Sequence, residues 1–153
     1  MDRISSFEVN HLTLKQGMYI SRIDDEIITY DIRLIKPNTP PFLEMAPIHT
    51  MEHLFATYAR NLYPKNIVYF GPMGCRTGFY LLTKNLNHQD AINLVIKSMK
   101  FISNFEGVIP GVSEIECGNY LEHNLDMARV YAKAMCDVLE NWTVEKLDYK
   151  YTN

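Results

Sequence analysis

The sequence predicts a single α+β domain in which an antiparallel β-sheet packs against α-helices. Its 153 residues, 47% of them hydrophobic and 22% charged, have the length and composition of one globular domain, and no repeat or linker divides residues 1–153. The stretches Met18 to Ile23 and Ile27 to Leu34 are rich in Ile, Tyr and Met and flank a polar turn, which indicates a β-hairpin. Later stretches repeat apolar residues with helical spacing, so strands and helices are expected to share one core.

A helix and two more strands are expected to follow the hairpin. The segment from Lys36 to Pro41 ends the second strand, because prolines fix φ and lack a backbone N–H. A helix then begins near Pro47, where the missing N–H costs little, and apolar residues continue along one face to Leu62. The next two strands, Asn66 to Phe70 and Thr77 to Thr83, are expected to pair with the hairpin.

Two further helices complete the expected fold. Asn87 can cap the first of them with its side chain, because Asp90 stands at the third helical position and an apolar stripe follows. A Pro-Gly pair at positions 110 and 111 ends that region. The last helix is expected from about Leu125 to Trp142, since apolar residues again repeat along one face.

Charge and cysteine content exclude several classes of protein. The net charge is −3 and no cluster of Lys and Arg appears, which argues against nucleic-acid binding. Met1 to Leu14 lacks the apolar core of a signal peptide, and no stretch approaches the roughly 20 apolar residues that span a bilayer. The three cysteines, Cys75, Cys117 and Cys136, are an odd number, as is common in a reducing compartment. We therefore expect a cytoplasmic protein, with Cys136 in the core.

A metal-binding motif, His49-Thr-Met-Glu-His53, lies on the first predicted helix. Residues four apart share one helical face, so both imidazoles can reach one metal ion while Glu52 projects nearby. This H-x-x-E-H pattern is typical of inverted-motif zinc enzymes. The alternative is an amphipathic helix with one core histidine and one exposed histidine.

A catalytic metal needs a third protein ligand and an open position. Cys117 is one candidate, since the following glycine gives its backbone unusual freedom. Glu114, Glu116 and Glu122 compete with it. A carboxylate would favour peptidase-like activation of water, whereas a thiolate would make the metal softer. The alternative is that Cys117 binds no metal and is a small, buried hydrophobic residue.

A second reactive group is predicted at the glycine-rich turn that runs from Gly71 to Gly78. It displays Cys75 beside Arg76 and exposed backbone N–H groups, which favour the thiolate form that exchanges protons near neutral pH. The spacing of a phosphate-binding P-loop is absent. The alternative is a tight hairpin that contains an incidental cysteine.

Five ordered blocks are spread over nearly the whole chain: Ser5-Ser-Phe-Glu-Val-Asn-His11, Tyr30-Asp-Ile-Arg-Leu34, His49 to Ala56, Pro72-Met-Gly-Cys-Arg-Thr-Gly-Phe-Tyr80, and Cys117-Gly118 with Glu122-His-Asn-Leu125. Together they resemble the S-ribosylhomocysteine lyase family, which makes the precursor of autoinducer-2. This resemblance is far more specific than the metal motif alone.

The resemblance implies a homodimer with active sites at the subunit interface and one divalent metal per subunit. The metal would be iron(II), with zinc or cobalt(II) as alternatives. His49, His53 and Cys117 match the family's metal ligands, and Glu52 and Cys75 match its general acid/base pair.

Ser6, His11 and Arg33 fall on positions that line the family's substrate pocket, part of which comes from the partner subunit. The chain departs from the family just before the Pro-Met-Gly-Cys block. It has Tyr69 and Gly71 where an acidic residue and a serine are usual. The acidic residue would pair with the amino group of the homocysteine moiety, and a tyrosine cannot supply that charge.

The implied reaction cleaves S-ribosylhomocysteine to homocysteine and 4,5-dihydroxy-2,3-pentanedione. It would serve quorum sensing through autoinducer synthesis, and methionine metabolism through the activated methyl cycle. Two alternatives remain at this point. One is an inverted-motif zinc peptidase with Glu52 as general base. The other is a degenerate family member that serves as a metal-stabilised binding domain, its site closed by a fourth ligand such as His11 or His123.

Overall fold

The computed structural model describes residues 2–152 and shows one antiparallel sheet and three α-helices. The chain forms, in order, η1 (Ser5–Phe7), β1 (Gly17–Asp24), β2 (Ile27–Arg33), α1 (Met45–Leu62), β3 (Ile67–Pro72), β4 (Gly78–Lys84), α2 (His88–Ser103), α3 (Leu125–Val138), η2 (Val144–Leu147) and η3 (Tyr149–Thr152). The predicted α+β class is confirmed.

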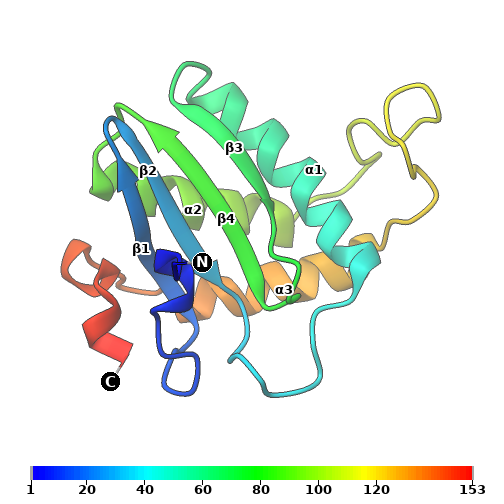
Figure 1. Cartoon of the computed structure of the whole chain (residues 1–153). Coiled ribbons are helices and arrows are strands. Elements are labelled where there is room, and N and C mark those ends of the chain that lie inside the picture. Colours follow the sequence, from blue (N-terminus) through cyan, green and yellow to red (C-terminus); the bar gives the residue numbers. More distant parts are fainter. Residues whose placement is uncertain (1, 153) are drawn as a thin grey trace.

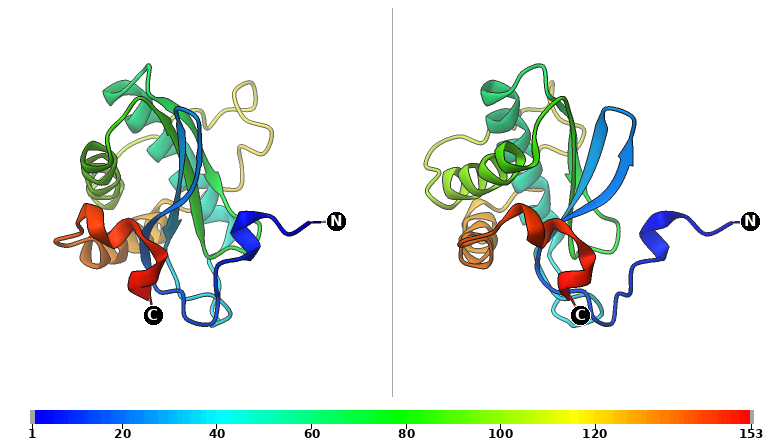
Figure 2. Two further views of the ribbon diagram at one scale, coloured as in Figure 1. Left: turned by 60° about the vertical axis from the view of Figure 1, so that its left-hand side comes forward. Right: turned by 90° about the vertical axis from the view of Figure 1, so that its left-hand side faces the viewer.

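The four strands lie in the order β1-β2-β4-β3, and every neighbouring pair is antiparallel. The helices cover one face of the sheet, and η1 lies on the other side (Figures 1 and 2). The predicted hairpin and its pairing with the later strands are therefore confirmed. Because β2 is central, its side chains are supported by strands on both sides.

The core lies between the sheet and the helices. Tyr30 and Ile32 of β2 are buried there, and Phe55 of α1 stacks on Phe70 of β3, which in turn stacks on Phe79 of β4. Successive side chains of a strand point to opposite faces. Asp31 and Arg33 therefore face away from the helices, yet both are buried.

The helix ends follow the local sequence signals at α2 and depart from them at α1 and α3. The Asn87 side chain accepts a hydrogen bond of 2.8 Å from the Asp90 N–H at the start of α2, as predicted. Helix α1 begins at Met45, two residues before the expected Pro47. Helix α3 ends at Val138 and not at Trp142, because Asn141 takes a left-handed φ of 58° and the Trp142 indole donates to the Met18 carbonyl at 3.0 Å.

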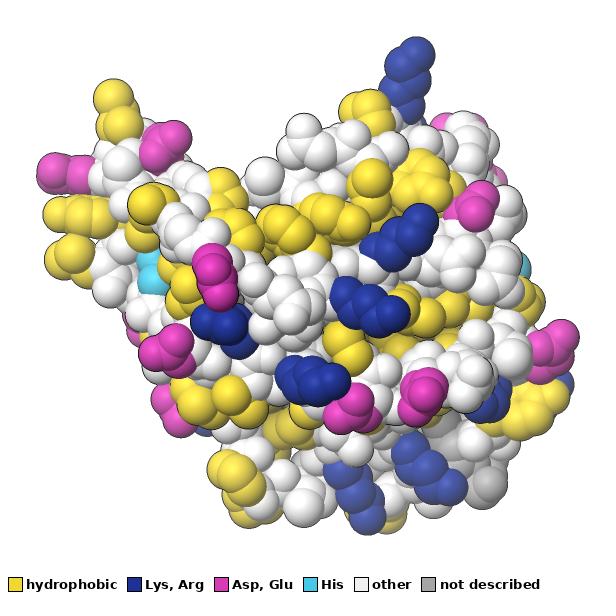
Figure 3. Space-filling view, turned by 180° about the vertical axis from the view of Figure 1, so that it is seen from behind, with side chains coloured by type: hydrophobic (Ala, Val, Ile, Leu, Met, Phe, Trp, Pro, Cys, Tyr) yellow, Lys and Arg dark blue, Asp and Glu magenta, His cyan; other side chains and the backbone are white. Residues whose placement is uncertain are grey.

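The connection between α2 and α3, residues 104–124, projects beyond α1 (Figure 1). Seen from behind, this projection carries hydrophobic side chains at its tip, whereas the helical face mixes Lys and Arg with Asp and Glu (Figure 3). Val108, Ile115 and Leu121 are its exposed hydrophobic residues. Within residues 2–152, no helix has both the length and the apolar composition needed to cross a membrane.

Candidate metal centre and thiol pocket

The two histidines of the predicted motif converge because α1 brings them to one face, one turn apart. Each ring is oriented by a backbone carbonyl from the other side of the site. His49 Nδ1 lies 2.8 Å from the Glu122 oxygen, and His53 Nδ1 lies 2.8 Å from the Pro110 oxygen. A carbonyl only accepts hydrogen bonds, so both Nδ1 atoms carry the hydrogen and both Nε2 atoms present a lone pair.

Cys117 comes from the long connection and meets these lone pairs. Its Sγ lies 3.4 Å from His49 Nε2 and 3.8 Å from His53 Nε2, and the Asn119 N–H donates to it at 3.4 Å. These residues and His123 form a group of nitrogen and sulfur atoms, all within 4.8 Å of one another, that is able to bind one metal ion. We call it the His/Cys group. Imidazole and thiolate donors suit iron, cobalt and zinc.

The competing carboxylates lie outside this group. Glu122 accepts from the Asn119 side chain at 2.5 Å, and Glu116 is hydrogen-bonded to the Ser113 hydroxyl. Glu114 is exposed. The thiol of Cys117, and no carboxylate, is therefore the third group beside the two histidines among residues 2–152.

The tautomer of His123 is determined by Thr50. The Thr50 hydroxyl donates to the Ala46 carbonyl at 3.1 Å and accepts from the Asn124 N–H at 2.9 Å. Its only hydrogen is thus in use, so it accepts from His123 Nδ1, which lies 3.1 Å away. His123 Nε2 then carries a lone pair, and this atom is buried without a hydrogen-bond partner among the described residues.

Burial, reinforced by the neighbouring His49 and His53, lowers the pKa of His123 to about 4, so its ring is neutral near pH 7. The His123 ring stacks on His49 with centroids 4.1 Å apart and an interplanar angle of 20°. A lone pair lies in the plane of its ring, so stacked rings are poorly oriented to bind one ion together. The rings of His49 and His53 are perpendicular and can do so. His123 is thus placed to support His49.

Glu52 lies in the same pocket as the His/Cys group. This His/Cys pocket has a volume of about 560 Å³, and His49, His53, Cys117 and Tyr69 are among its lining residues. Among the described residues, no hydrogen bond or ion pair occupies the Glu52 carboxylate. The carboxylate is therefore available for proton transfer beside the metal-binding atoms.

The predicted thiol, Cys75, stands on the turn between β3 and β4. The turn is closed by the hydrogen bond from the Met73 N–H to the Gly78 carbonyl at 2.9 Å. Cys75 Sγ lies 3.1 Å from Thr77 Oγ1 and 3.9 Å from Arg33 Nη1. We expected Arg76 to supply the neighbouring cation, but its side chain is exposed, and the guanidinium that faces the sulfur belongs to Arg33.

Arg33 is held by a buried ion pair with Asp31. Its Nε and Nη2 donate to the two carboxylate oxygens at 3.1 and 2.6 Å, and its Nη1 donates to Thr77 Oγ1 at 2.7 Å. Burial by itself would lower the pKa of Arg33, but the Asp31 carboxylate outweighs burial and the pKa lies above its usual value. Arg33 is therefore a permanent cation, and the Thr77 hydroxyl keeps its own hydrogen for the Cys75 sulfur.

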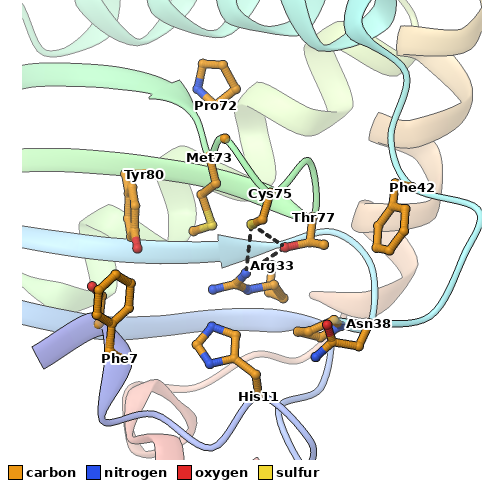
Figure 4. A pocket seen from close by; sticks show the side chains of 13 residues that line it. Phe7, His11, Arg33, Asn38, Phe42, Pro72, Met73, Cys75, Thr77 and Tyr80 are labelled. Carbon is orange, nitrogen blue, oxygen red and sulfur yellow. Dashed lines mark hydrogen bonds between the residues drawn. The ribbon is translucent and has the colours of Figure 1, made fainter.

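Cys75 opens into a second pocket of about 550 Å³, the Cys75 pocket (Figure 4). Ser6 and His11 from the N-terminal segment line it together with Arg33. All three residues expected to contact substrate thus surround the predicted thiol. The His11 ring is oriented by the Val9 carbonyl, 2.8 Å from Nδ1, and it belongs to this pocket and not to the His/Cys group.

The two pockets have no lining residue in common. Within one chain, Glu52 and Cys75 therefore face separate cavities. The structure brings together the predicted metal-binding residues, and separately the thiol and the residues expected around substrate. It does not bring the two sets into one pocket.

Tyr69 and Gly71, the two departures from the resembled family, are sterically compatible with each other. A Cβ atom built on Gly71 would lie 1.9 Å from the hydroxyl oxygen of Tyr69, so the Tyr69 ring occupies the space that a side chain at position 71 would need. Tyr69 is 49% exposed and lines the His/Cys pocket. Tyr69 is therefore compatible with a glycine at position 71 and not with a serine unless the ring moves.

Fold and site together define a single-domain α+β enzyme with a His/Cys centre able to bind one metal ion. Residues 4–146 match the family model of S-ribosylhomocysteinase (LuxS), and the chain belongs to this family. The resemblance stated from the five blocks is confirmed.

Curated bacterial relatives agree with this assignment. Proteins named S-ribosylhomocysteine lyase are 46% identical in Clostridium acetobutylicum, 44% in Finegoldia magna and 47% in Borreliella afzelii. Each comparison covers 97% of this chain and 99% of the relative.

Proposed function

We propose that this protein cleaves S-ribosylhomocysteine to homocysteine and 4,5-dihydroxy-2,3-pentanedione. The observation that carries the proposal is the convergence of the Cys117 sulfur with two imidazole lone pairs beside the Glu52 carboxylate. Family membership supplies the substrate class. The main competitor, a zinc peptidase, requires a carboxylate as third ligand, and the three candidate glutamates lie outside the group.

In this proposal His49, His53 and Cys117 hold one divalent metal, and His123 supports His49. When bound, the metal supplies Lewis-acid polarisation of the carbonyl and hydroxyl oxygens of the open-chain sugar, which makes adjacent C–H protons acidic. We propose iron(II) as the metal in the cell, with zinc or cobalt(II) as substitutes, because two imidazoles and one thiolate accept all three.

Glu52 and Cys75 move the protons. Two successive enolisations shift the carbonyl from C1 to C2 and then to C3, each by removal of a proton from one carbon and its return to the neighbouring carbon. The C5 thioether is then β to the carbonyl, so loss of the C4 proton breaks the C5–S bond and homocysteine leaves with a proton on sulfur. The remaining C4–C5 enol takes up a proton at C5 and loses the one on its hydroxyl, which gives the dione. Arg33 and Thr77 face the Cys75 sulfur at 3.9 and 3.1 Å and orient it for this work.

We further propose that the working site is completed by a second subunit. One substrate must meet both Glu52 and Cys75, yet these residues face separate pockets in one chain. Exposed hydrophobic residues accompany both pockets: Phe7 lines the Cys75 pocket, and Ile115 and Leu121 lie on the connection that carries Cys117. A homodimer that places one pocket against the partner's other pocket would bury them.

Ser6, His11 and Arg33 would bind the substrate in this arrangement. In the cell we propose a cytoplasmic enzyme whose homocysteine returns to methionine metabolism through the activated methyl cycle. The pentanedione product would feed autoinducer synthesis for quorum sensing.

The direct test is release of free thiol from S-ribosylhomocysteine by anaerobically purified protein, with and without a chelator. We expect metal-dependent release that the Cys75→Ala variant lacks. Absence of release from the metal-loaded dimer would contradict the substrate assignment and direct attention to Tyr69 and Gly71, where the chain departs from the resembled family.

The remaining alternative is a binding domain whose metal only stabilises the fold. A closed structural site predicts global unfolding on chelation, whereas a catalytic site in a domain of this size predicts loss of activity with most of the structure retained. Circular dichroism melts with and without chelator distinguish the two. His11 lies in the Cys75 pocket and so does not close the metal site as a fourth ligand, whereas His123 belongs to the His/Cys group and the melts decide whether it does.

A further inference from the structure

The C-terminal turn η3 (Tyr149–Thr152) reaches the network behind the reactive thiol. The Tyr149 hydroxyl donates a hydrogen bond of 2.8 Å to Asp31 Oδ2, the same oxygen that accepts from Arg33 Nη2 at 2.6 Å. Arg33 in turn faces the Cys75 sulfur. A residue near the end of the chain is thus connected to the thiol through two intermediate side chains.

Tyr149 is firmly placed by its surroundings. Its ring stacks on the buried Tyr19 of β1 with centroids 5.0 Å apart and an interplanar angle of 23°. Tyr19 also packs edge-on against Trp142. Burial, strengthened by the Asp31 carboxylate, raises the pKa of Tyr149 far above its usual value, so its hydroxyl is a permanent donor.

The geometry of Arg33 transmits the position of Asp31 to the sulfur. The guanidinium is a planar fork, and Asp31 takes two of its N–H groups while Nη1 is left for Thr77 and Cys75. A shift of the carboxylate therefore turns Nη1. The Asp31 charge also opposes a negative charge on the sulfur, and the Tyr149 hydrogen bond offsets part of that charge.

We propose that Tyr149 is a positioning residue for the reactive thiol: its hydroxyl holds and partly neutralises Asp31, so that Arg33 stabilises the Cys75 thiolate. Tyr149 lies beyond residues 4–146, the part of the chain that matches the family model. The inference rests on the proposed function only for the use of the thiol in turnover. The reactivity of Cys75 itself does not depend on the identity of the substrate.

The test is the rate at which iodoacetamide alkylates Cys75 at fixed neutral pH, followed by mass spectrometry of the Cys75 peptide. The thiolate is the form that reacts, so the rate reports the thiolate fraction. Tyr149→Phe keeps the ring and removes only the hydroxyl. The hydrogen bond that Tyr149→Phe removes goes to a charged group, and such bonds are stronger than neutral ones. We therefore expect Cys75 in this variant to be alkylated about three- to tenfold more slowly than in the parent.

Two controls make the result specific. Tyr151→Phe removes a hydroxyl from the same turn, on an exposed ring, and is expected to leave the rate unchanged. Cys136, which packs against the core from α3, serves as the internal reference in each sample. Equal rates at Cys75 in Tyr149→Phe and the parent would overturn the proposal. A change of similar size at Cys136 would also overturn it, because it would indicate general loosening.

A second variant separates the hydroxyl from the ring. Tyr149→Leu removes both, and we expect it to slow Cys75 alkylation at least as much as Tyr149→Phe does. Slower alkylation in Tyr149→Leu alone would show that the ring merely packs and would overturn the proposal. If the protein turns over S-ribosylhomocysteine, Tyr149→Phe is expected to lower kcat by a similar factor and leave KM unchanged. Without turnover, the alkylation result still decides the inference.

Discussion

The His/Cys pocket stands on one helix and a long connection, whereas the Cys75 pocket stands on paired strands. In the first, the position of Cys117 depends on residues 104–124, which have no regular secondary structure of their own up to the start of α3. In the second, Arg33 lies on the inner strand β2 and is held by a buried carboxylate. Strand pairing and a buried ion pair position the thiol pocket, whereas hydrogen bonds to the connection position the His/Cys group, so we expect a bound ion to add more order to the second pocket than to the first.

The largest expected effect is at the His/Cys pocket. Cys117→Ala removes the sulfur that residues 104–124 place beside the two histidines of α1. We expect the purified protein to lose nearly all bound metal and all turnover. Metal content after dialysis measures this. Cys136→Ala is the matched control and should retain metal. Metal binding as tight as in the parent would show that Cys117 is not the third ligand.

A change at Glu52 separates metal binding from proton transfer in the same pocket. Glu52→Gln has nearly the same shape but cannot exchange a proton at working pH, so we expect full metal content and turnover lower by about 10²- to 10⁴-fold. Glu114→Gln, on the exposed connection, serves as the control for loss of a negative charge. If Glu52→Gln turned over substrate as fast as the parent, Glu52 would not be the acid or base.

Mixed dimers test whether the two pockets meet across subunits. When Glu52→Gln and Cys75→Ala homodimers exchange subunits, each mixed dimer has one site with both groups intact if the sites are shared. A statistical mixture should then recover about a quarter of parental turnover. Sites contained within one chain predict no recovery. Thiol release before and after subunit exchange provides the measurement.

The buried ion pair makes the stability of the Cys75 pocket depend on Asp31. Asp31→Ala leaves the Arg33 guanidinium buried without its anion, and we expect a loss of about 3 kcal/mol in the free energy of unfolding. Asp24→Ala breaks the exposed pair with Arg22 and should cost less than about 1 kcal/mol. Urea unfolding measures both. Equal losses of unfolding free energy in the two variants would mean that the buried Asp31–Arg33 pair stabilises the protein no more than the exposed Asp24–Arg22 pair.

The smallest expected effect follows metal removal from the folded protein. Chelation should increase amide hydrogen exchange in residues 104–124 and leave β2 and β4 protected, because the ion secures only the connection. The thermal midpoint should fall by a few degrees. Increased exchange throughout the sheet would contradict the contrast between the two pockets.

Much of the fold was predictable from local patterns. The hairpin, the cap at Asn87 and the helical stripe from Pro47 to Leu62 are short-range features, and each is present. The expected end of the last helix at Trp142 was wrong by four residues. Helical periodicity continues past Val138, but the indole turns back to the Met18 carbonyl, a contact far away in the sequence.

The site was predictable only in part. The four-residue spacing of His49 and His53 puts both on one helical face, so the metal motif could be predicted from the sequence alone. The choice of Cys117 over three glutamates rested on the resemblance to a family, because no spacing rule connects α1 to a residue on a distant connection. No local sequence pattern predicts that the His123 ring stacks on His49. The sequence indicates His123 only as a possible fourth metal ligand.

The sequence by itself determined the α+β class, the His49–His53 motif, the turn that presents Cys75 and the family. These features are carried by periodicity, short spacings and ordered blocks of residues. Only the tertiary structure decided that Arg33 and not Arg76 faces the thiol, that Tyr149 supports Asp31, and that Glu52 and Cys75 lie in separate pockets. Those facts depend on which distant segments pack together, and that is decided by burial across the whole domain.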